Sequence, residues 1–315
     1  MSSILTVTLN PCIDLGTSVQ RVVAGSKLRC AAPTVEPGGG GVNVARAIRK
    51  LGGESTALIV VGGATGQRLE LLLDSEGIKT HPVQTRHETR QSFAVTDSTT
   101  GEQYRFSLPG ETVEPQVAKQ VQTEICDATQ KDAFVVFSGS VSPGLSADYY
   151  SALVDLLAPK TDRVIIDTSG PVLDHLIASP SRPILLLRMD RKEALGAAGL
   201  AAETTEASAD FAKGLIARGV AKIIVIGQGA KGSLMVTKDQ KLFCAPPIVP
   251  VRSTIGAGDS FVGAVTLSLY RGLSPQDALQ MGVAAATATV LTEGTALCRL
   301  TDVKRLLPDC TMGSL

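Results

Sequence analysis

Short apolar runs that alternate with helix-like segments are the feature of this sequence that most limits its fold. The runs lie at residues 4–9, 56–61, 133–137, 163–166, 184–187 and 222–226. Strands buried on both faces form continuous apolar runs, and helices between them are typical of parallel strands joined by crossovers. The pattern therefore predicts an α/β fold in which a mostly parallel central sheet carries helices on both faces.

Two segments interrupt this alternation. Residues 91–108 alternate apolar and polar side chains around the polar turn Asp97–Gly101, which predicts an antiparallel hairpin with one buried face. Residues 15–35 are also extended in character. We expect these excursions to form a small β lid, and such a lid is a candidate dimer surface. The expected division is 1–14, 36–88 and 109–315 for the main domain, and 15–35 and 89–108 for the lid.

Composition argues against several classes of protein. The 315 residues contain 30 Lys plus Arg and 30 Asp plus Glu, so net charge gives no reason to expect binding to nucleic acid or a membrane. No apolar run has the length of a bilayer span, and the first residues do not resemble a signal peptide. The six cysteines form no CxxC pair, and no zinc pattern is present. Scattered cysteines suit a reducing compartment, so we expect a cytoplasmic protein.

The segment Thr254–Ala264 is the most informative candidate site. Gly256, Ala257 and Gly258 are small enough for backbone N–H groups to approach a ligand, and they lead into a helix whose N-terminus favours an anion. A carboxylate at Asp259 would repel a bound phosphate unless it had a chemical task there. Accepting the proton of a hydroxyl that attacks the phosphate is such a task. The alternative is a simple helix cap after a glycine turn.

A second glycine-rich loop, Gly38–Gly41, leads into a predicted helix with Asn43 in its first turn. Backbone and amide groups there can bind sugar hydroxyls, and a loose turn is the alternative. Asp14 follows Asn10-Pro11, and we expect it at the carboxyl end of the first strand, where open parallel sheets bind ligands. An aspartate that only stabilises the turn is the alternative at this position.

Residues 227–232 match the pattern GxGxxG but do not predict a dinucleotide site. The following segment, Ser233–Thr237, is β-like, so no helix N-terminus would face a pyrophosphate. A glycine-rich turn between strands can still line a nucleotide, which makes Gly227, Gly229 and Gly232 candidate nucleotide contacts.

Taken together, these segments resemble the ribokinase-like carbohydrate kinase family from Ile4 to about Cys298. The resemblance rests on two signatures in order, Gly38–Ala45 and Ser253–Asp259. It implies a three-layer α/β/α sandwich with a small β lid. Within the family the chain resembles the phosphosugar branch, and most of all the type 2 6-phosphofructokinases. The stretches that carry this last similarity are 25–30, 36–43, 62–66, 89–91, 101–106 and 294–298.

The resemblance implies an enzyme that uses Mg²⁺ and ATP to phosphorylate a ketohexose phosphate. Fructose 6-phosphate is the first expected acceptor, and tagatose 6-phosphate and fructose 1-phosphate are the alternatives. A non-catalytic sugar-phosphate sensor is the alternative from another class of protein. The branch also implies a homodimer formed through the β lid.

The resemblance assigns roles to individual residues. Asp259 would be the general base, and the anion hole would comprise Gly256, Ala257 and Gly258. The sugar hydroxyls would be held by Asp14, Gly39 and Asn43. The phosphate already on the sugar would be bound by Lys27 and Arg90, and Lys27 would reach the site of a neighbouring subunit. The set of acceptor-binding residues is completed by Gly40, Arg105 and Ser138.

The donor side departs from the family pattern. The family motif is Asn-x-x-Glu, usually preceded by Lys-Pro, and residues 188–193 here read Arg-Met-Asp-Arg-Lys-Glu. We expect Asp190 and Glu193 to bind Mg²⁺, and Arg188 and Lys192 to contact the nucleotide together with Asp190. Gly227 stands where the family usually carries Ser or Thr. Donor affinity and donor identity are therefore open.

Overall fold

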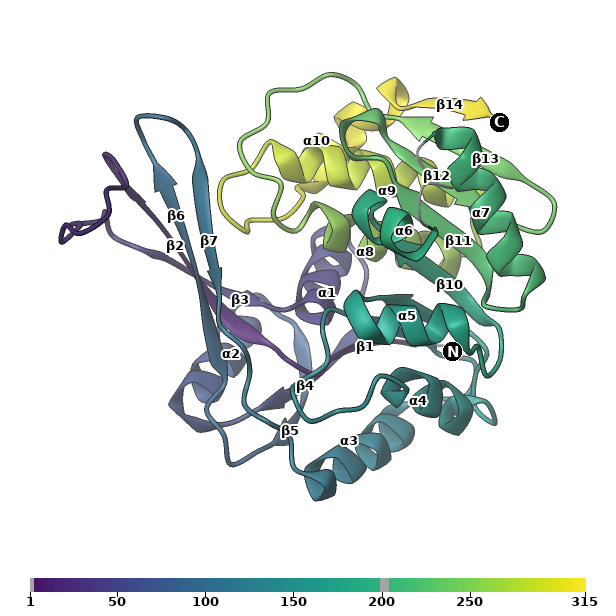
Figure 1. The fold of residues 1–315 in the computed structure, drawn as a ribbon, viewed down its shortest axis with the longest axis horizontal. Helices are drawn as coiled ribbons and strands as arrows, with labels where there is room; N and C mark the ends of the chain where they lie inside the picture. Colours follow the sequence, from purple (N-terminus) through teal and green to yellow (C-terminus); the bar gives the residue numbers. More distant parts are fainter. Residues whose placement is uncertain (1–2, 199–203) are drawn as a thin grey trace.

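The computed structural model describes residues 3–198 and 204–315. Within these residues a ten-stranded sheet lies between two layers of helices, and a separate four-stranded sheet projects from one side of the molecule (Figure 1). The large sheet has the order β14-β13-β12-β11-β10-β9-β8-β1-β4-β5. The arrangement confirms the predicted α/β/α sandwich.

Most of the large sheet is parallel, as the apolar runs predict. The parallel strands, from the edge inward, are β5 (Lys79–Gln84), β4 (Thr56–Val61), β1 (Ile4–Thr8), β8 (Phe134–Ser138), β9 (Val164–Asp167), β10 (Ile184–Met189) and β11 (Ala221–Gly227). The antiparallel strands at the other edge are β12 (Ser233–Val236), β13 (Lys241–Ala245) and β14 (Thr311–Ser314). The strand order reverses between β1 and β8, and open sheets bind ligands at such a point.

Each face of the sheet is covered by helices that pack on apolar strand residues. One layer comprises α3 (Pro115–Ala128), α4 (Tyr149–Leu157), α5 (Gly170–Ala178), α6 (Arg191–Ala198) and α7 (Thr205–Ala217). The other comprises α1 (Gly40–Lys50), α2 (Gly63–Ser75), α8 (Ala257–Tyr270), α9 (Pro275–Val290) and α10 (Leu300–Leu306). The second layer brings the two glycine-rich signatures together, because α1 and α8 begin within them.

We refer to the four-stranded sheet as the lid. Its order is β3-β2-β6-β7, with β2 (Cys12–Val19), β3 (Thr34–Gly38), β6 (Arg90–Asp97) and β7 (Gln103–Ser107). The antiparallel β6–β7 hairpin turns at the predicted residues. The lid begins at Cys12, so Asp14 lies inside β2 and the expectation that it ends the first strand is wrong. The chain leaves β1 at Asn10-Pro11 and enters the lid at once.

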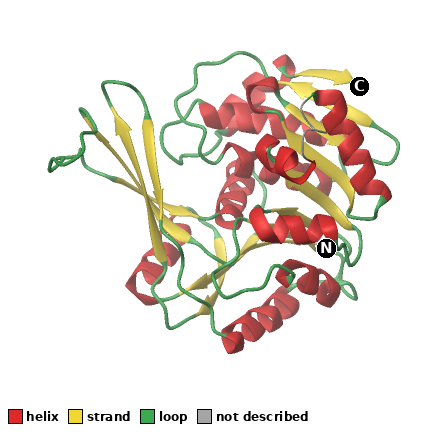
Figure 2. Cartoon of the chain, viewed as in Figure 1, coloured by secondary structure: helices red, strands yellow, loops and turns green. Residues whose placement is uncertain are grey.

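The hairpin's predicted buried face is exposed in the single chain. Register places Phe93 opposite Phe106 and Val95 opposite Tyr104, so these side chains share one face of the lid. Phe93 is 38% exposed, Tyr104 37% and Phe106 54%. The lid projects from the main domain (Figure 2), and the described part of this chain leaves that face partly open. Alternation therefore predicted which side chains share a face, but the expectation that this face is buried is wrong for the described chain.

The packing of α1 on β1 predicts a stability difference between two glycines. A Cβ at Gly41 would lie 2.4 Å from the Val7 carbonyl oxygen and 2.5 Å from Thr8 Oγ1, whereas one at Gly214 in α7 would meet no atom within 4 Å. We expect Gly41→Ala to lower the free energy of unfolding by about 1–3 kcal/mol. Gly214→Ala should raise it by about 0.5–1 kcal/mol. Denaturant unfolding of both variants tests this, and equal effects would contradict the close approach.

Candidate active site

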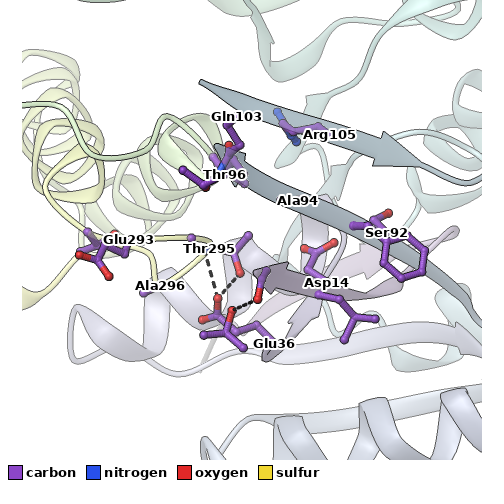
Figure 3. A pocket seen from close by; sticks show the side chains of 18 of the residues that line it. Asp14, Glu36, Ser92, Ala94, Thr96, Gln103, Arg105, Glu293, Thr295 and Ala296 are labelled. Atoms are coloured by element: carbon purple, nitrogen blue, oxygen red, sulfur yellow. Dashed lines mark hydrogen bonds between the residues drawn. The ribbon is translucent and has the colours of Figure 1, made fainter. Parts of the chain in front are cut away.

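A cleft of about 1620 Å³ lies between the lid and the glycine-rich starts of α1 and α8. It is located where the strand order reverses between β1 and β8. The lid contributes Asp14 and Arg105, which appear with their neighbours in Figure 3. The main domain contributes Asn43 and Asp259, and also loop residues 291–296. The topology therefore brings both sequence signatures and the lid to one site.

Asp259 occupies the first turn of α8, on the floor of the cleft. Its Oδ2 accepts a hydrogen bond from Asn43 Nδ2 at 2.9 Å. Desolvation, and secondly the negative charge of Asp167, raise the pKa of Asp259 to about 7, although the Asn43 hydrogen bond and the Arg188 charge lower it. A carboxyl group with this pKa can exchange a proton near neutral pH, as a general base must.

The turn before α8 needs glycine for a geometric reason. Gly256 precedes the helix with φ of 75°, a left-handed conformation. The following residues Ala257 and Gly258 begin the helix, so their backbone N–H groups have no acceptor within it, although the Ala257 N–H donates a long bond to the Thr254 carbonyl oxygen at 3.4 Å. These groups and the positive end of the helix dipole can bind an anion close to the Asp259 carboxylate.

Asp167 is a site residue that the sequence reasoning missed. It ends β9, and its Oδ1 accepts a hydrogen bond from Arg188 Nη1 at 3.1 Å. Ser138 Oγ donates to the other oxygen, Oδ2, at 3.4 Å. A Cβ at Gly258 would lie 3.1 Å from Arg188 Nη2, so the guanidinium lies beside the glycine turn. The signal available was an aspartate directly after a predicted parallel strand, at the ligand-binding edge.

The predicted acceptor residues of the main domain lie at the mouth of α1. Gly39 and Gly40 line the cleft together with Asn43. A Cβ at Gly40 would come within 2.5 Å of Ser138 Oγ and 2.6 Å of the Gly139 nitrogen. Ser138 is buried behind Gly40, at the end of β8. The glycine-rich loop is therefore packed tightly against β8, which excludes the reading of a loose turn.

The lid places two arginines and an aspartate on the cleft. Burial raises the pKa of Asp14, although a hydrogen bond from Cys12 Sγ, 3.2 Å from Oδ1, lowers it. The Arg90 guanidinium is anchored by the carbonyl oxygens of Asn10 and Leu108, at 3.1 Å each. Arg105 projects from β7 into the same cleft. Positive charge at this wall suits an anionic group of a ligand.

Several predicted residues lie outside the cleft. Lys27 is exposed in the lid loop between β2 and β3, and Lys192 is exposed on α6. Asp190 and Glu193 cap the start of α6 reciprocally: the Glu193 N–H donates to Asp190 Oδ1 at 2.8 Å, and the Asp190 N–H donates to Glu193 Oε2 at 2.6 Å. This pairing gives both carboxylates a local structural task.

The glycine turn after β11 has one clear packing constraint. Gly227 ends that strand near Arg188, and Gly229 begins a short 3₁₀ turn. Gly232 has φ of 124°, and a Cβ there would lie 2.0 Å from the Cys244 carbonyl oxygen. The close approach of β13 therefore accounts for Gly232 without a ligand. Among residues 3–198 and 204–315, no group of three or more His, Cys, Asp or Glu side chains is arranged to hold a metal ion.

Comparison with known proteins gives similarity along nearly the whole chain. Residues 7–302 match the model of the pfkB family carbohydrate kinases. An ATP-dependent 6-phosphofructokinase isozyme 2 from Mycobacterium tuberculosis is 40% identical over 303 residues, which cover 96% of this chain and 88% of the relative. Its Escherichia coli K12 namesake is 36% identical over 306 residues, with coverage of 97% and 98%. A 1-phosphofructokinase from Xanthomonas campestris is 30% identical over 308 residues, with coverage of 97% and 94%.

Solved structures give the same result for the fold. A crystal structure of phosphofructokinase-2 from Escherichia coli in complex with substrates and products matches with a TM-score of 0.93 and 36% identity, covering 98% of this chain and 99% of that chain. The tetrameric inhibited form of the same Escherichia coli protein matches with a TM-score of 0.91 and 35% identity, with the same coverage. The similarity therefore includes the lid as well as the main domain.

The raised pKa of Asp259 predicts how stability depends on pH. Between about pH 4 and pH 7 the folded state keeps a proton that the unfolded state has lost, so above about pH 7 the ionised carboxylate is a full cost to folding. Asparagine has no such cost. We expect Asp259→Asn to melt at a higher temperature than the parent protein at about pH 8, and the difference should shrink towards about pH 4. A difference independent of pH would contradict the raised pKa.

Proposed function

The chain belongs to the pfkB family of carbohydrate kinases, and from this premise we propose that it transfers the γ-phosphoryl group of ATP to fructose 6-phosphate, giving fructose 1,6-bisphosphate. The observation that carries the proposal is the Asp259 carboxyl group, whose pKa is raised to about 7, beside the anion-binding turn of α8. It lies in a cleft whose opposite wall carries Arg90 and Arg105. The relatives with the highest identity reported above bear the name of this activity.

The mechanism follows from this geometry. Asp259 takes the proton of the attacking sugar hydroxyl, and the oxygen of that hydroxyl forms a bond to the γ-phosphorus of ATP. The bond between the γ-phosphorus and the bridging oxygen breaks as the new bond forms, and ADP leaves with that oxygen. The N–H groups of Gly256–Gly258 and the Arg188 guanidinium stabilise negative charge on the transferring group. Asp14, Gly39 and Asn43 hold the sugar hydroxyls. The protein therefore contributes position, charge and one base.

The residues at the start of α6 fit a magnesium ion that accompanies ATP. Asp190 and Glu193 each use one carboxylate oxygen for the helix cap, so the second oxygen of each lies outside the cap. Magnesium prefers such oxygen ligands and usually keeps several waters, with the remaining positions taken by substrate phosphates. The ion would neutralise phosphate charge next to these carboxylates. Gly227, Gly229 and Lys192 complete the proposed nucleotide side.

A second copy of the chain completes the proposed assembly. The lid exposes Phe93, Tyr104 and Phe106 on one face, and apolar exposure of this kind is typical of an interface. We therefore place a homodimer contact at this face. In such a dimer Lys27, which is outside the cleft of its own chain, would reach the phosphate end of the neighbouring site. The lid would then close over the acceptor, as lids do to exclude water.

Two phosphosugars remain as alternative acceptors. The 1-phosphofructokinase that is 30% identical favours fructose 1-phosphate, and tagatose 6-phosphate is the other candidate. A non-catalytic sensor is disfavoured because it would have no use for a base such as Asp259. The cysteines fit a cytoplasmic location, since none of the six forms a disulfide bond. No described helix is long and apolar enough to cross a bilayer.

A panel of acceptors tests the proposed function. Purified protein with MgATP should release ADP fastest with fructose 6-phosphate, and more slowly with tagatose 6-phosphate, fructose 1-phosphate and plain fructose. Arg105→Gln should raise KM for fructose 6-phosphate at least about tenfold and leave KM for ATP within about twofold, because the arginine binds the sugar phosphate. Arg68→Gln, on the exposed surface of α2, is the matched control. ADP release at background level with all acceptors would overturn the proposal.

The base assignment gives a separate prediction. Asp259→Asn should lower kcat by roughly 10²–10⁴-fold, the range for loss of a positioned base. In the parent protein kcat/KM should fall below about pH 7, because protonated Asp259 cannot accept the proton of the hydroxyl. Steady-state rates across pH measure both effects. A variant with near-normal turnover, or a flat profile from about pH 5 to 8, would show that another group takes the proton.

A further inference from the structure

The Glu36 carboxylate has no role in the proposed chemistry, but it connects the lid to the base and to the anion-binding turn of the main domain. Glu36 lies on β3, directly opposite Asp14 of β2. Its Oε2 accepts hydrogen bonds from the Thr295 backbone N–H, at 3.1 Å, and from the Thr295 hydroxyl (Figure 3). Its Oε1 lies 3.3 Å from Arg46 Nη2. The side chain is 21% exposed, so these contacts are largely shielded from water.

The first connection leads from Glu36 to the base. Arg46, on α1, is 2% exposed and pairs with both Glu36 and Glu76. Its Nη1 donates to Asn43 Oδ1 at 3.3 Å. This bond leaves the Asn43 amide nitrogen to face Asp259, to which it donates at 2.9 Å. Arg46 thus determines which end of the amide meets the carboxylate.

The second connection leads from Glu36 to the anion-binding turn. Thr295 belongs to the loop after α9, whose Gly294 carbonyl oxygen accepts a hydrogen bond from Ser253 Oγ at 2.9 Å. Leu297 in the same loop is fully buried and has φ of 40°, a strained value for leucine. A Cβ at Gly256 would lie 2.4 Å from Leu297 Cδ2, so this side chain packs directly on the turn. Such strain persists only where surrounding contacts hold it.

We propose that Glu36 is a positioning residue that holds the base and the anion-binding turn in register with each other and with the lid. It reaches Asp259 through Arg46 and Asn43, and it reaches Gly256 through Thr295 and Leu297. The inference rests on the proposed kinase function, because its consequence is alignment of a hydroxyl, a base and a phosphoryl group. Misplacement of such groups by about 1 Å can cost on the order of 100-fold in rate.

Glu36→Gln tests the proposal with little change in shape. The amide would turn a donor towards either Arg46 or Thr295, each of which is itself a donor. We expect kcat to fall by roughly 10- to 100-fold, while the dissociation constant for fructose 6-phosphate stays within about threefold. Amide hydrogen exchange should become faster in the peptide that covers 253–260.

The matched control is Glu124→Gln on α3, outside the cleft. Glu124 pairs with His81 at 2.9 Å at the surface and is 37% exposed, so both measurements should stay close to those of the parent protein. If Glu36→Gln does not fold, Thr295→Val removes the hydroxyl, one of the two donors of Thr295 to Glu36, and Thr295→Ser retains it. The valine variant should show the same two effects, and the serine variant should restore parent values.

The outcomes separate this inference from the proposed function. If the parent protein is active and Glu36→Gln leaves either kcat or hydrogen exchange unchanged, the positioning role alone is overturned. A parent protein without kinase activity overturns the proposed function, and the exchange measurement then decides whether Glu36 holds the turn. An equal fall in kcat in Glu36→Gln and in the control Glu124→Gln would also contradict the proposal.

Discussion

The hydrogen bond between Asn43 and Asp259 is the contact on which the site depends. It joins the first turns of α1 and α8, two helices that start 217 residues apart in sequence, at the carboxyl edge of the sheet. The helices can approach because a Cβ at Gly263 would lie only 2.8 Å from Ala47 Cβ. Each helix begins in a glycine-rich segment, so the bond also brings the N-terminal N–H groups of two helices to one cleft.

This arrangement concentrates negative charge beside the turn where we propose that a phosphate binds. The negative charge of Asp167 disfavours ionisation of Asp259, and the Arg188 charge opposes this effect beside Gly258. The protein tolerates the unfavourable carboxylate because a base with a pKa near neutrality is useful there. In the proposed function, the lid contributes the arginines that would bind the acceptor's phosphate. Binding and chemistry are thus supplied by different sheets, and Glu36 connects them.

The sequence predicted local features well and long-range contacts poorly. Continuous apolar runs predicted the parallel sheet, and the two glycine signatures predicted Asp259 and Asn43, because each is a local pattern. Asp14 was misplaced because Asn10-Pro11 can end a strand or lead into the next sheet, and local residues do not decide between them. Asp167 and Glu36 were missed because their partners are distant in sequence. The exposure of the hairpin's apolar face was not predicted, because alternation shows which side chains share a face and not what lies against that face.

A structure with fructose 6-phosphate and an unreactive ATP analogue tests the central claim most directly. The claim is that Asp259 accepts the proton of the attacking hydroxyl beside the α8 turn. The account predicts the hydroxyl oxygen on C1 within about 2.6–3.2 Å of an Asp259 carboxylate oxygen, with the γ-phosphate at the N–H groups of Gly256–Gly258. A hydroxyl that meets a different side chain, with Asp259 still bonded only to Asn43, would contradict it.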